Sequence, residues 1–257
     1  MIRKKKDYQS IFYILFTLLV LYLLSPELSS IAKEEPVKPN KKLVVIDAGH
    51  GGKDTGASGV SGLTEKGITL KLALILRDML IKKPNLNVLL TRTENIDIAP
   101  EKRVSLANSK SADIFLSLHV NGSFDPAQKG IEIYYYSEEN LELFLQASPG
   151  QTLSPKAESE ETSTLISTWN EAQNAFIPKS LKLAKILDDN LRKLQDLEVR
   201  GIRPAPLYVL TGTTMPSLVI EAGFVTNTAE ESALARDEYL KAIASKIADG
   251  IGEYFEE

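Results

Sequence analysis

The chain has 257 residues, of which 43% are hydrophobic and 25% charged, and this composition suits one folded α/β domain better than two. Its formal net charge of −4 excludes the basic surface that nucleic-acid-binding proteins carry, so no nucleic-acid partner is expected. The absence of cysteine excludes disulfides and thiolate metal sites together, so a transition-metal site must use histidine, aspartate or glutamate.

The N-terminal segment has the pattern of an export signal. Basic residues at 3–6 precede an apolar run at 11–24, and the small-residue pattern Ser-Ile-Ala follows at 30–32. Residues 1–32 are therefore interpreted either as a signal peptide cleaved after residue 32 or as an uncleaved inner-membrane anchor formed by residues 8–24. The apolar run gives about 21 Å of helix, short of the roughly 30 Å hydrocarbon core, which favours cleavage. Either interpretation places the remaining chain in the periplasm or another extracytoplasmic space, with membrane contact through this segment alone.

Strands and helices are expected to alternate after a charged, proline-containing linker at 33–42. The folded domain, 43–257, is predicted to be α/β: a single domain with a mostly parallel, twisted sheet of about six strands and helices on both faces. The predicted strands are 44–46, 88–91, 113–118, 130–137, 207–210 and 218–221, and the predicted helices are 69–82, 101–110, 181–194 and 235–255.

Residues 137–178 interrupt this alternation and are predicted to be an insertion. The region carries an acidic cluster formed by Glu158, Glu160 and Glu161. Apolar residues follow at 165, 169, 172 and 176, and these spacings of four, three and four residues place them on one face of a helix.

The chain has two histidines, and each follows an apolar strand-like run. His50 comes shortly after the strand predicted at 44–46, and His119 comes directly after the strand predicted at 113–118. Ligands in open α/β sheets bind beyond the carboxyl ends of the strands, and neutral imidazole is the commonest side-chain ligand of a catalytic metal. We therefore expect the two histidines to meet around one metal ion.

Glu65 is the leading candidate for a third metal ligand, because catalytic zinc sites usually have three protein ligands and one open position. It stands at the end of a glycine-rich loop and opens the helix that follows His50. A carboxylate also suits the positive end of a helix dipole, so spacing alone leaves two interpretations of Glu65 open: a metal ligand, or a residue that stabilises the helix.

Glu221 ends a predicted buried strand, a position where a charged group is rarely placed without a partner. Beside a metal site, its carboxylate could take a proton from water and later deliver it to a leaving amine; the alternative is a structural ion pair. Asn121 either orients substrate or holds the loop after His119. Glu132 either lines the cleft or occupies an exposed strand position.

Six motifs, in order, closely resemble those of the zinc-dependent N-acetylmuramoyl-L-alanine amidases that split bacterial cell-wall septa, the Amidase_3 family. They are DAGHGG at 47–52, GLTEK at 62–66, LTRT at 90–93, SLHVN at 117–121, GIEIYY at 130–135 and MPSLVIEAGF at 215–224. The resemblance runs from about residue 43 to residue 255 and implies one zinc ion per chain bound by His50, Glu65 and His119, with Glu221 as the catalytic base.

The resemblance also implies a substrate and a form of control. The substrate is the amide that joins N-acetylmuramic acid to L-alanine in peptidoglycan, cut during wall remodelling and daughter-cell separation. Related division amidases carry an insertion at the place of residues 137–178, whose helix covers the zinc until an activator protein displaces it. Glu158, Glu160 or Glu161 would then supply a carboxylate near the open metal position. Another zinc peptidase or deacetylase of the envelope, and a non-catalytic wall-binding protein on the same fold, remain alternatives.

Overall fold

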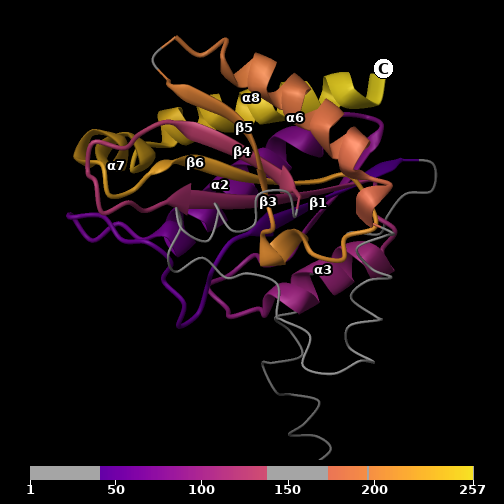
Figure 1. Ribbon diagram of the computed structural model, residues 1–257, viewed down its shortest axis with the longest axis horizontal. Coiled ribbons are helices and arrows are strands. Elements are labelled where there is room, and N and C mark those ends of the chain that lie inside the picture. The colour runs from indigo at the N-terminus through magenta and orange to yellow at the C-terminus, as the bar shows by residue number, and fades with distance from the viewer. Residues whose placement is uncertain (1–40, 138–172, 196, 257) are drawn as a thin grey trace, which may run out of the picture. The chain divides into compact units, whose positions relative to one another are not determined.

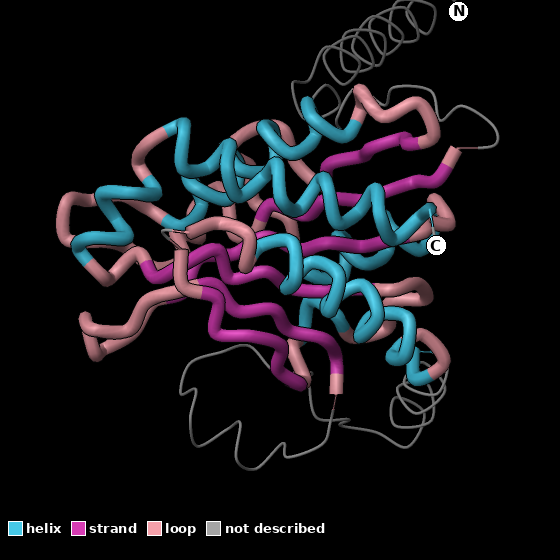
Figure 2. Tube along the Cα trace, turned by 90° about the horizontal axis from the view of Figure 1, so that it is seen from above, coloured by secondary structure: helices cyan, strands magenta, loops and turns pink. Residues whose placement is uncertain are grey.

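The computed structural model describes residues 41–137, 173–195 and 197–256. These form one α/β unit, built on a six-stranded sheet in the order β2-β1-β3-β6-β4-β5 (Figures 1 and 2). The strands are β1 (Lys42–Ala48), β2 (Leu86–Leu90), β3 (Ile114–Asn121), β4 (Ile131–Tyr136), β5 (Val199–Ala205) and β6 (Ser217–Phe224). The helices are α2 (Glu65–Leu80), α3 (Pro100–Ser109), α6 (Ile177–Leu191), α7 (Thr228–Leu234) and α8 (Asp237–Glu256), together with the short 3-10 helix η2 (Tyr208–Leu210).

The sheet is mostly parallel, as the alternation of elements predicts. Strands β2, β1, β3 and β6 are parallel to one another, whereas β4 pairs antiparallel with β6 and parallel with β5. All eight residues of β6 are buried, and so are all residues of β1 after its first. Continuous apolar runs of this kind arise because helices cover both faces of the sheet.

Two apolar layers hold the helices against the sheet. Helix α8 packs between α2 and α6 over one face, where the larger cluster of buried aliphatic side chains lies. Helix α3 and η2 contact each other, and Figure 1 shows α3 on the side of the sheet opposite α6 and α8. The smaller cluster, which includes Val45, Phe115 and Val219, lies on that second face. The expectation of one domain with helices on both faces is therefore confirmed.

Several element boundaries differ from the sequence-based expectation. Residues 207–210, predicted as a strand, contain the 3-10 helix η2, and the sixth strand is instead β5, which the sequence did not reveal. This strand lies at the sheet edge, where a proline and two arginines are tolerated, so it lacks an apolar run. The helix predicted at 235–255 corresponds to α8, and the shorter helix α7 before it was not predicted.

The export signal or anchor predicted at 1–32 lies outside the described residues, as does most of the predicted insertion at 137–178. In the described ranges, no helix is both long enough and apolar enough to cross a membrane. Helix α6 starts at Ile177, so the last residues of the predicted insertion already belong to the domain. Gln173 is buried there, and its side chain accepts a hydrogen bond from the backbone N–H of Gly212.

Candidate active site

A cleft of about 790 Å³ opens on the smaller-cluster face of the sheet. Side chains from the loop after β1, the start of α2, β3, β6 and β4 line it, among them His50, Glu65, His119 and Glu221. His119 and Glu221 lie inside β3 and β6 rather than just beyond or at the ends of these strands, because both strands continue for three residues past the expected limit. They are direct neighbours in the parallel register, which brings the proposed base beside a proposed ligand.

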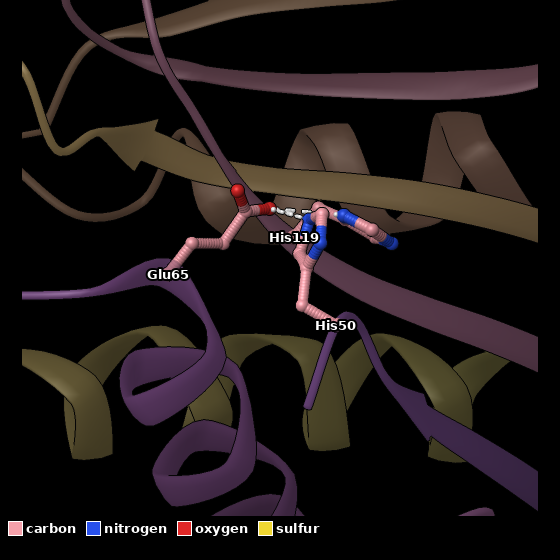
Figure 3. A group of neighbouring side chains, drawn as sticks. All are labelled: His50, Glu65 and His119. Carbon is pink, nitrogen blue, oxygen red and sulfur yellow. Dashed lines mark hydrogen bonds and ion pairs between the residues drawn. The ribbon is translucent and has the colours of Figure 1, made fainter. Parts of the chain in front are cut away.

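His50, Glu65 and His119 converge on one point, although they come from three separate segments. Glu65 Oε1 lies 3.0 Å from His50 Nε2 and 2.9 Å from His119 Nδ1 (Figure 3). One potential ligand atom from each residue lies within 4.8 Å of the others. Two imidazole nitrogens and a carboxylate oxygen are a donor set suited to zinc. The three candidate ligands therefore stand close enough to share one ion.

The backbone around Glu65 fixes its carboxylate in place. Glu65 is the first residue of α2, and it accepts hydrogen bonds from the backbone N–H groups of Val120 at 3.0 Å and Ala57 at 2.8 Å. Burial alone would raise the pKa of Glu65, but the hydrogen bonds and positive character of the two imidazoles outweigh it and hold that pKa well below its usual range. The carboxylate is thus kept ionised, as a metal ligand must be.

Asp54 orients the imidazole of His50. Its Oδ2 lies 2.7 Å from His50 Nδ1, so His50 donates its Nδ1 proton to Asp54 and turns Nε2 toward Glu65. In neutral His50 the Nε2 lone pair then faces a carboxylate oxygen, and this contact needs either a proton or a cation between the two atoms. Burial lowers the pKa of His50, but the hydrogen bonds and charges of Glu65 and Asp54 outweigh it and raise the pKa. The site is therefore built to attract positive charge.

Glu221 is buried in the cleft wall, and its Oε2 has no hydrogen-bond partner among the described residues. Burial raises the pKa of Glu221 well above its usual range, and the negative charges of Glu65 and Glu132 add to this effect. Among the residues that the structure describes, Glu221 forms no ion pair, so the alternative of a structural ion pair finds no partner there. A buried carboxyl with a free oxygen at this place can exchange a proton with a bound molecule.

Glu132 lines the cleft and is buried, which settles its position in favour of the first of the two interpretations. It is the antiparallel register partner of Glu221. Its Oε2 accepts hydrogen bonds from Asn121 Nδ2 at 3.0 Å and from the Tyr134 hydroxyl at 2.8 Å. Asn121 therefore holds Glu132, a contact that the sequence did not indicate. Burial, together with the charge of Glu132, raises the pKa of Tyr134 and keeps its hydroxyl protonated.

Two buried arginines fix the loop that carries His50. Arg92 donates to the backbone oxygens of Ala48 and Gly49, and Arg103 donates to those of Ala48 and His50. His50 itself has a φ of 59°, in the left-handed region, which non-glycine residues rarely adopt. The arginines stabilise this strained loop and so position the imidazole.

Gly49 allows the two histidines to approach each other. A Cβ atom at this position would lie 2.5 Å from Cε1 and Nε2 of His119, well inside van der Waals contact. The two imidazole rings consequently pack edge to face, with centroids 5.0 Å apart. The motif residue before His50 thus has a steric function at the site.

The structure assembles some predicted residues, leaves others undescribed and adds new ones. It brings together His50, Glu65, His119, Glu221, Asn121 and Glu132. Glu158, Glu160 and Glu161 lie outside the described residues. Sequence reasoning missed Asp54, although its spacing of four from His50 offered a signal, and it missed Arg200 and Arg203, which line the cleft from β5.

Comparisons with known proteins agree with this architecture. The family model for N-acetylmuramoyl-L-alanine amidases, Amidase_3, matches residues 44–253. The amidase AmiA of Salmonella typhimurium (strain LT2) is 29% identical over 246 residues, which cover 88% of this chain and 85% of that protein. The germination-specific N-acetylmuramoyl-L-alanine amidase of Bacillus subtilis (strain 168) is 29% identical over 274 residues, covering 99% of this chain and 97% of the relative.

Among solved structures, the amidase AmiC2 of Nostoc punctiforme is 28% identical, with a TM-score of 0.65 and coverage of 84% of this chain and 98% of that one. The family match spans most of the chain, and the fold agrees with that of a relative. The chain therefore belongs to the Amidase_3 family of N-acetylmuramoyl-L-alanine amidases.

Proposed function

We propose that this protein is a zinc-dependent N-acetylmuramoyl-L-alanine amidase, which hydrolyses the amide between N-acetylmuramic acid and L-alanine in peptidoglycan. The observation that carries the proposal is the convergence of His50, Glu65 and His119 beside Glu221, a buried carboxyl with one oxygen that has no hydrogen-bond partner among the described residues. Membership of the amidase family supports the substrate.

The three converging residues fit one zinc ion by their chemistry. Two neutral imidazoles and one carboxylate leave the ion with one net positive charge, and Asp54 supports the set by orienting His50. The chemistry that zinc supplies when bound is polarisation of the amide carbonyl and a lowered pKa of water. The same donor set offers no thiolate or thioether, so a soft metal such as Cu(I) is disfavoured.

Glu221 performs the proton transfers in this proposal. Water adds to the amide carbonyl carbon and gives its proton to Glu221 Oε2, and the carbon–nitrogen bond then breaks as Glu221 returns that proton to the leaving nitrogen. A group that both takes and gives a proton near neutral pH works best with a raised carboxyl pKa, and burial raises that of Glu221. Glu132 lies next to Glu221 across the strand pair and is held by other side chains, so it serves in positioning.

Product analysis separates this proposal from a zinc peptidase or deacetylase with the same ligands. Purified protein is incubated with peptidoglycan in three samples: untreated, treated with a chelator, and treated with a chelator and then with zinc. The masses of the released fragments are measured by mass spectrometry. We expect stem peptides with a free L-alanine amino terminus, lost with chelator and restored by zinc. Cleavage within the stem, or release of acetate, would replace the amidase by one of the alternatives.

Two variants divide the metal ligands from the base. His50→Ala should lose zinc and activity together, whereas Glu221→Gln should keep zinc and lose activity by about 100-fold or more. Zinc content is measured by elemental analysis on folded protein, checked by circular dichroism. If peptidoglycan is not cut at all, the protein is a non-catalytic wall-binding member of the fold, and binding to sedimented walls would show it.

The cellular part of the proposal is wall remodelling for daughter-cell separation, by an enzyme exported through residues 1–32. A second role, in spore germination, is favoured by the match to the germination-specific relative, which covers 99% of this chain. A deletion strain distinguishes them: chains of unseparated cells support the first role, and normal separation with defective germination supports the second. A partner that activates the enzyme by displacing residues 137–178 also belongs to this proposal.

A further inference from the structure

The wall of the cleft formed by β5 carries two arginines that the hydrolytic chemistry does not use. Arg200 Nε and Arg203 Nη2 each lie 3.2 Å from Glu132 Oε1, and both side chains line the cleft. The acidic side chains Glu65 and Glu221 line the same cleft. The arginine pair therefore makes a positively charged patch on one wall of the cleft that also holds Glu65 and Glu221.

A β-bulge brings the two arginines to the same side of the sheet. Residues three apart on a regular strand point to opposite faces. In the β4–β5 pair, however, Ile131 faces Val199 and Glu132 faces Gly201, so Arg200 is an extra residue in β5. Gly201 has a φ of 99°, which a residue with a side chain rarely adopts. Bulges of this kind re-aim a side chain and recur next to active sites.

Glu132 cannot neutralise both arginines. Its single negative charge faces two guanidinium groups, and its other oxygen already accepts hydrogen bonds from Asn121 and Tyr134. Arg200 is further held by a hydrogen bond of 2.6 Å from its Nη1 to Gln128. One positive charge therefore remains in excess on this wall.

Arg203 is the arginine that stays accessible. Its side chain is 46% exposed, against 25% for Arg200. Arg200 also stacks over the Phe224 ring, with its guanidinium carbon 5.4 Å from the ring centroid. Arg200 thus anchors Glu132, while the more exposed Arg203 contacts Glu132 through Nη2 and can use its other guanidinium nitrogens for a bound anion. Such a fork matches the geometry of a carboxylate.

The position of this patch sets the length of substrate that would reach it. His119, Glu221 and Glu132 are in register on three adjacent strands, so two strand spacings, or about 10 Å, separate His119 from Glu132. An extended peptide covers about 3.3–3.6 Å per residue, so this distance corresponds to about three residues. A stem peptide whose L-alanine amide lies at the proposed metal centre would bring its next residues to Arg203.

We propose that Arg203, with Arg200 anchoring Glu132 beside it, binds a free carboxylate of the peptidoglycan stem peptide. This carboxylate belongs to the second or third residue of the stem when L-alanine is counted as the first. The inference rests on the proposed amidase function, and it assigns to β5 the recognition of the stem. This contact with Arg203 makes the enzyme prefer stem peptides in which that group is a free carboxylate to stem peptides in which it is a carboxamide.

A purely structural role for the two arginines makes a different prediction. If they serve to hold Glu132 in place, removing Arg203 harms every substrate equally, because the damage lies in the enzyme. If Arg203 binds a substrate carboxylate, its removal harms the carboxylate substrate and leaves the carboxamide unaffected. The ratio between the two substrates therefore separates the roles, whatever happens to absolute activity.

The test uses the full chain and two pairs of stem tripeptides that begin with L-alanine. In each pair, one peptide carries a carboxylate and the other carries a carboxamide at the same place. The first pair differs on the second residue, and the second pair differs on the third residue. Binding is measured by calorimetry, and KM and kcat are measured on the corresponding muramoyl peptides. We expect the wild type to bind one carboxylate peptide at least about 10-fold more tightly than its carboxamide. Arg203→Ala should abolish that preference and raise KM for the carboxylate substrate by a similar factor, with kcat within about twofold.

Arg203→Lys should restore part of the preference, since it keeps the charge but not the fork. Arg192→Ala is the matched control, because this arginine pairs with Asp188 on α6 and does not line the cleft. The inference is overturned if the wild type binds the carboxylate and carboxamide peptides equally tightly. It is also overturned if Arg203→Ala lowers the affinity for both peptides by the same factor. Binding is read without turnover, so a carboxylate preference in a protein that cuts no muramoyl peptide would count against the proposed hydrolysis and not against this site.

Discussion

Replacing Asp47 by asparagine should destabilise the domain through the loss of one buried charge. Asp47 is fully buried at the end of β1, and its Oδ1 accepts hydrogen bonds from Thr91 Oγ1 at 2.6 Å and Arg103 Nη1 at 2.7 Å. Its Oδ2 accepts one from Ser117 Oγ at 2.6 Å. In Asp47→Asn the shape is preserved, but the guanidinium of Arg103 loses its buried counter-charge.

The magnitude follows from which contacts survive. Removing one partner of a buried ion pair costs about 3–5 kcal/mol. The asparagine oxygen can still accept from Thr91 and Arg103, and the Ser117 hydroxyl can rotate to accept from the new amide, so the lower end applies, about 3 kcal/mol. For a domain of this size such a loss lowers Tm by about 6–12 °C. Asp47→Ala removes all three hydrogen bonds as well and should cost more.

The pH dependence has a definite sign. Burial alone would raise the pKa of Asp47, but the charge of Arg103 and the hydrogen bonds from Ser117 and Thr91 outweigh it and lower that pKa. The contribution to the free energy of unfolding is therefore fully present above the unfolded pKa of about 3.9 and is lost as pH falls through the folded pKa. The stability gap between wild type and Asp47→Asn should be constant near pH 7 and narrow below about pH 4.

Urea unfolding followed by circular dichroism, at several pH values, measures this gap. Asp78→Asn is the control, because Asp78 forms an exposed pair with Arg77 on α2 and its loss should change the free energy of unfolding by less than about 0.5 kcal/mol. The reasoning is refuted if Asp47→Asn is as stable as this control at pH 7, or if the gap does not narrow in acid.

Three further predictions concern the site. Asp54→Ala should weaken zinc binding by about 10- to 100-fold, because His50 loses the partner that orients it; a competitive chelator titration measures this, and unchanged affinity contradicts the role of Asp54. Gly49→Ala should lower zinc affinity by a similar factor, because its Cβ would overlap the ring of His119; wild-type affinity in the same titration would show that the ring can shift freely. Replacing residues 158–172 by a Gly/Ser linker should raise basal hydrolysis several-fold at constant zinc content, and unchanged activity in the folded deletion would exclude autoinhibition by this segment.

The sequence by itself determined the fold class and the candidate metal ligands. Continuous apolar runs mark buried parallel strands, and polar residues at their ends mark the ligand-binding edge, so His50, His119 and Glu221 could be found from local pattern. Glu65 left two interpretations open, because a carboxylate at a helix start suits a dipole as well as an ion. In the folded protein, Glu65 contacts both imidazoles, and these contacts favour the interpretation of Glu65 as a ligand of the proposed zinc ion.

Tertiary structure alone decided the features that depend on contacts between distant segments. Strand β5 carries arginines and a proline in place of an apolar run, so its pairing with β4 is visible only once the sheet edge is assembled. The bulge at Arg200 reverses the alternation of side chains, and no local pattern predicts that reversal. Within the described part of the chain, the Oε2 atom of Glu221 has no hydrogen-bond partner, and this too follows from what surrounds it in space. Local periodicity records which face of an element is buried, whereas the partners of a buried charge are set by segments that meet only in the folded protein.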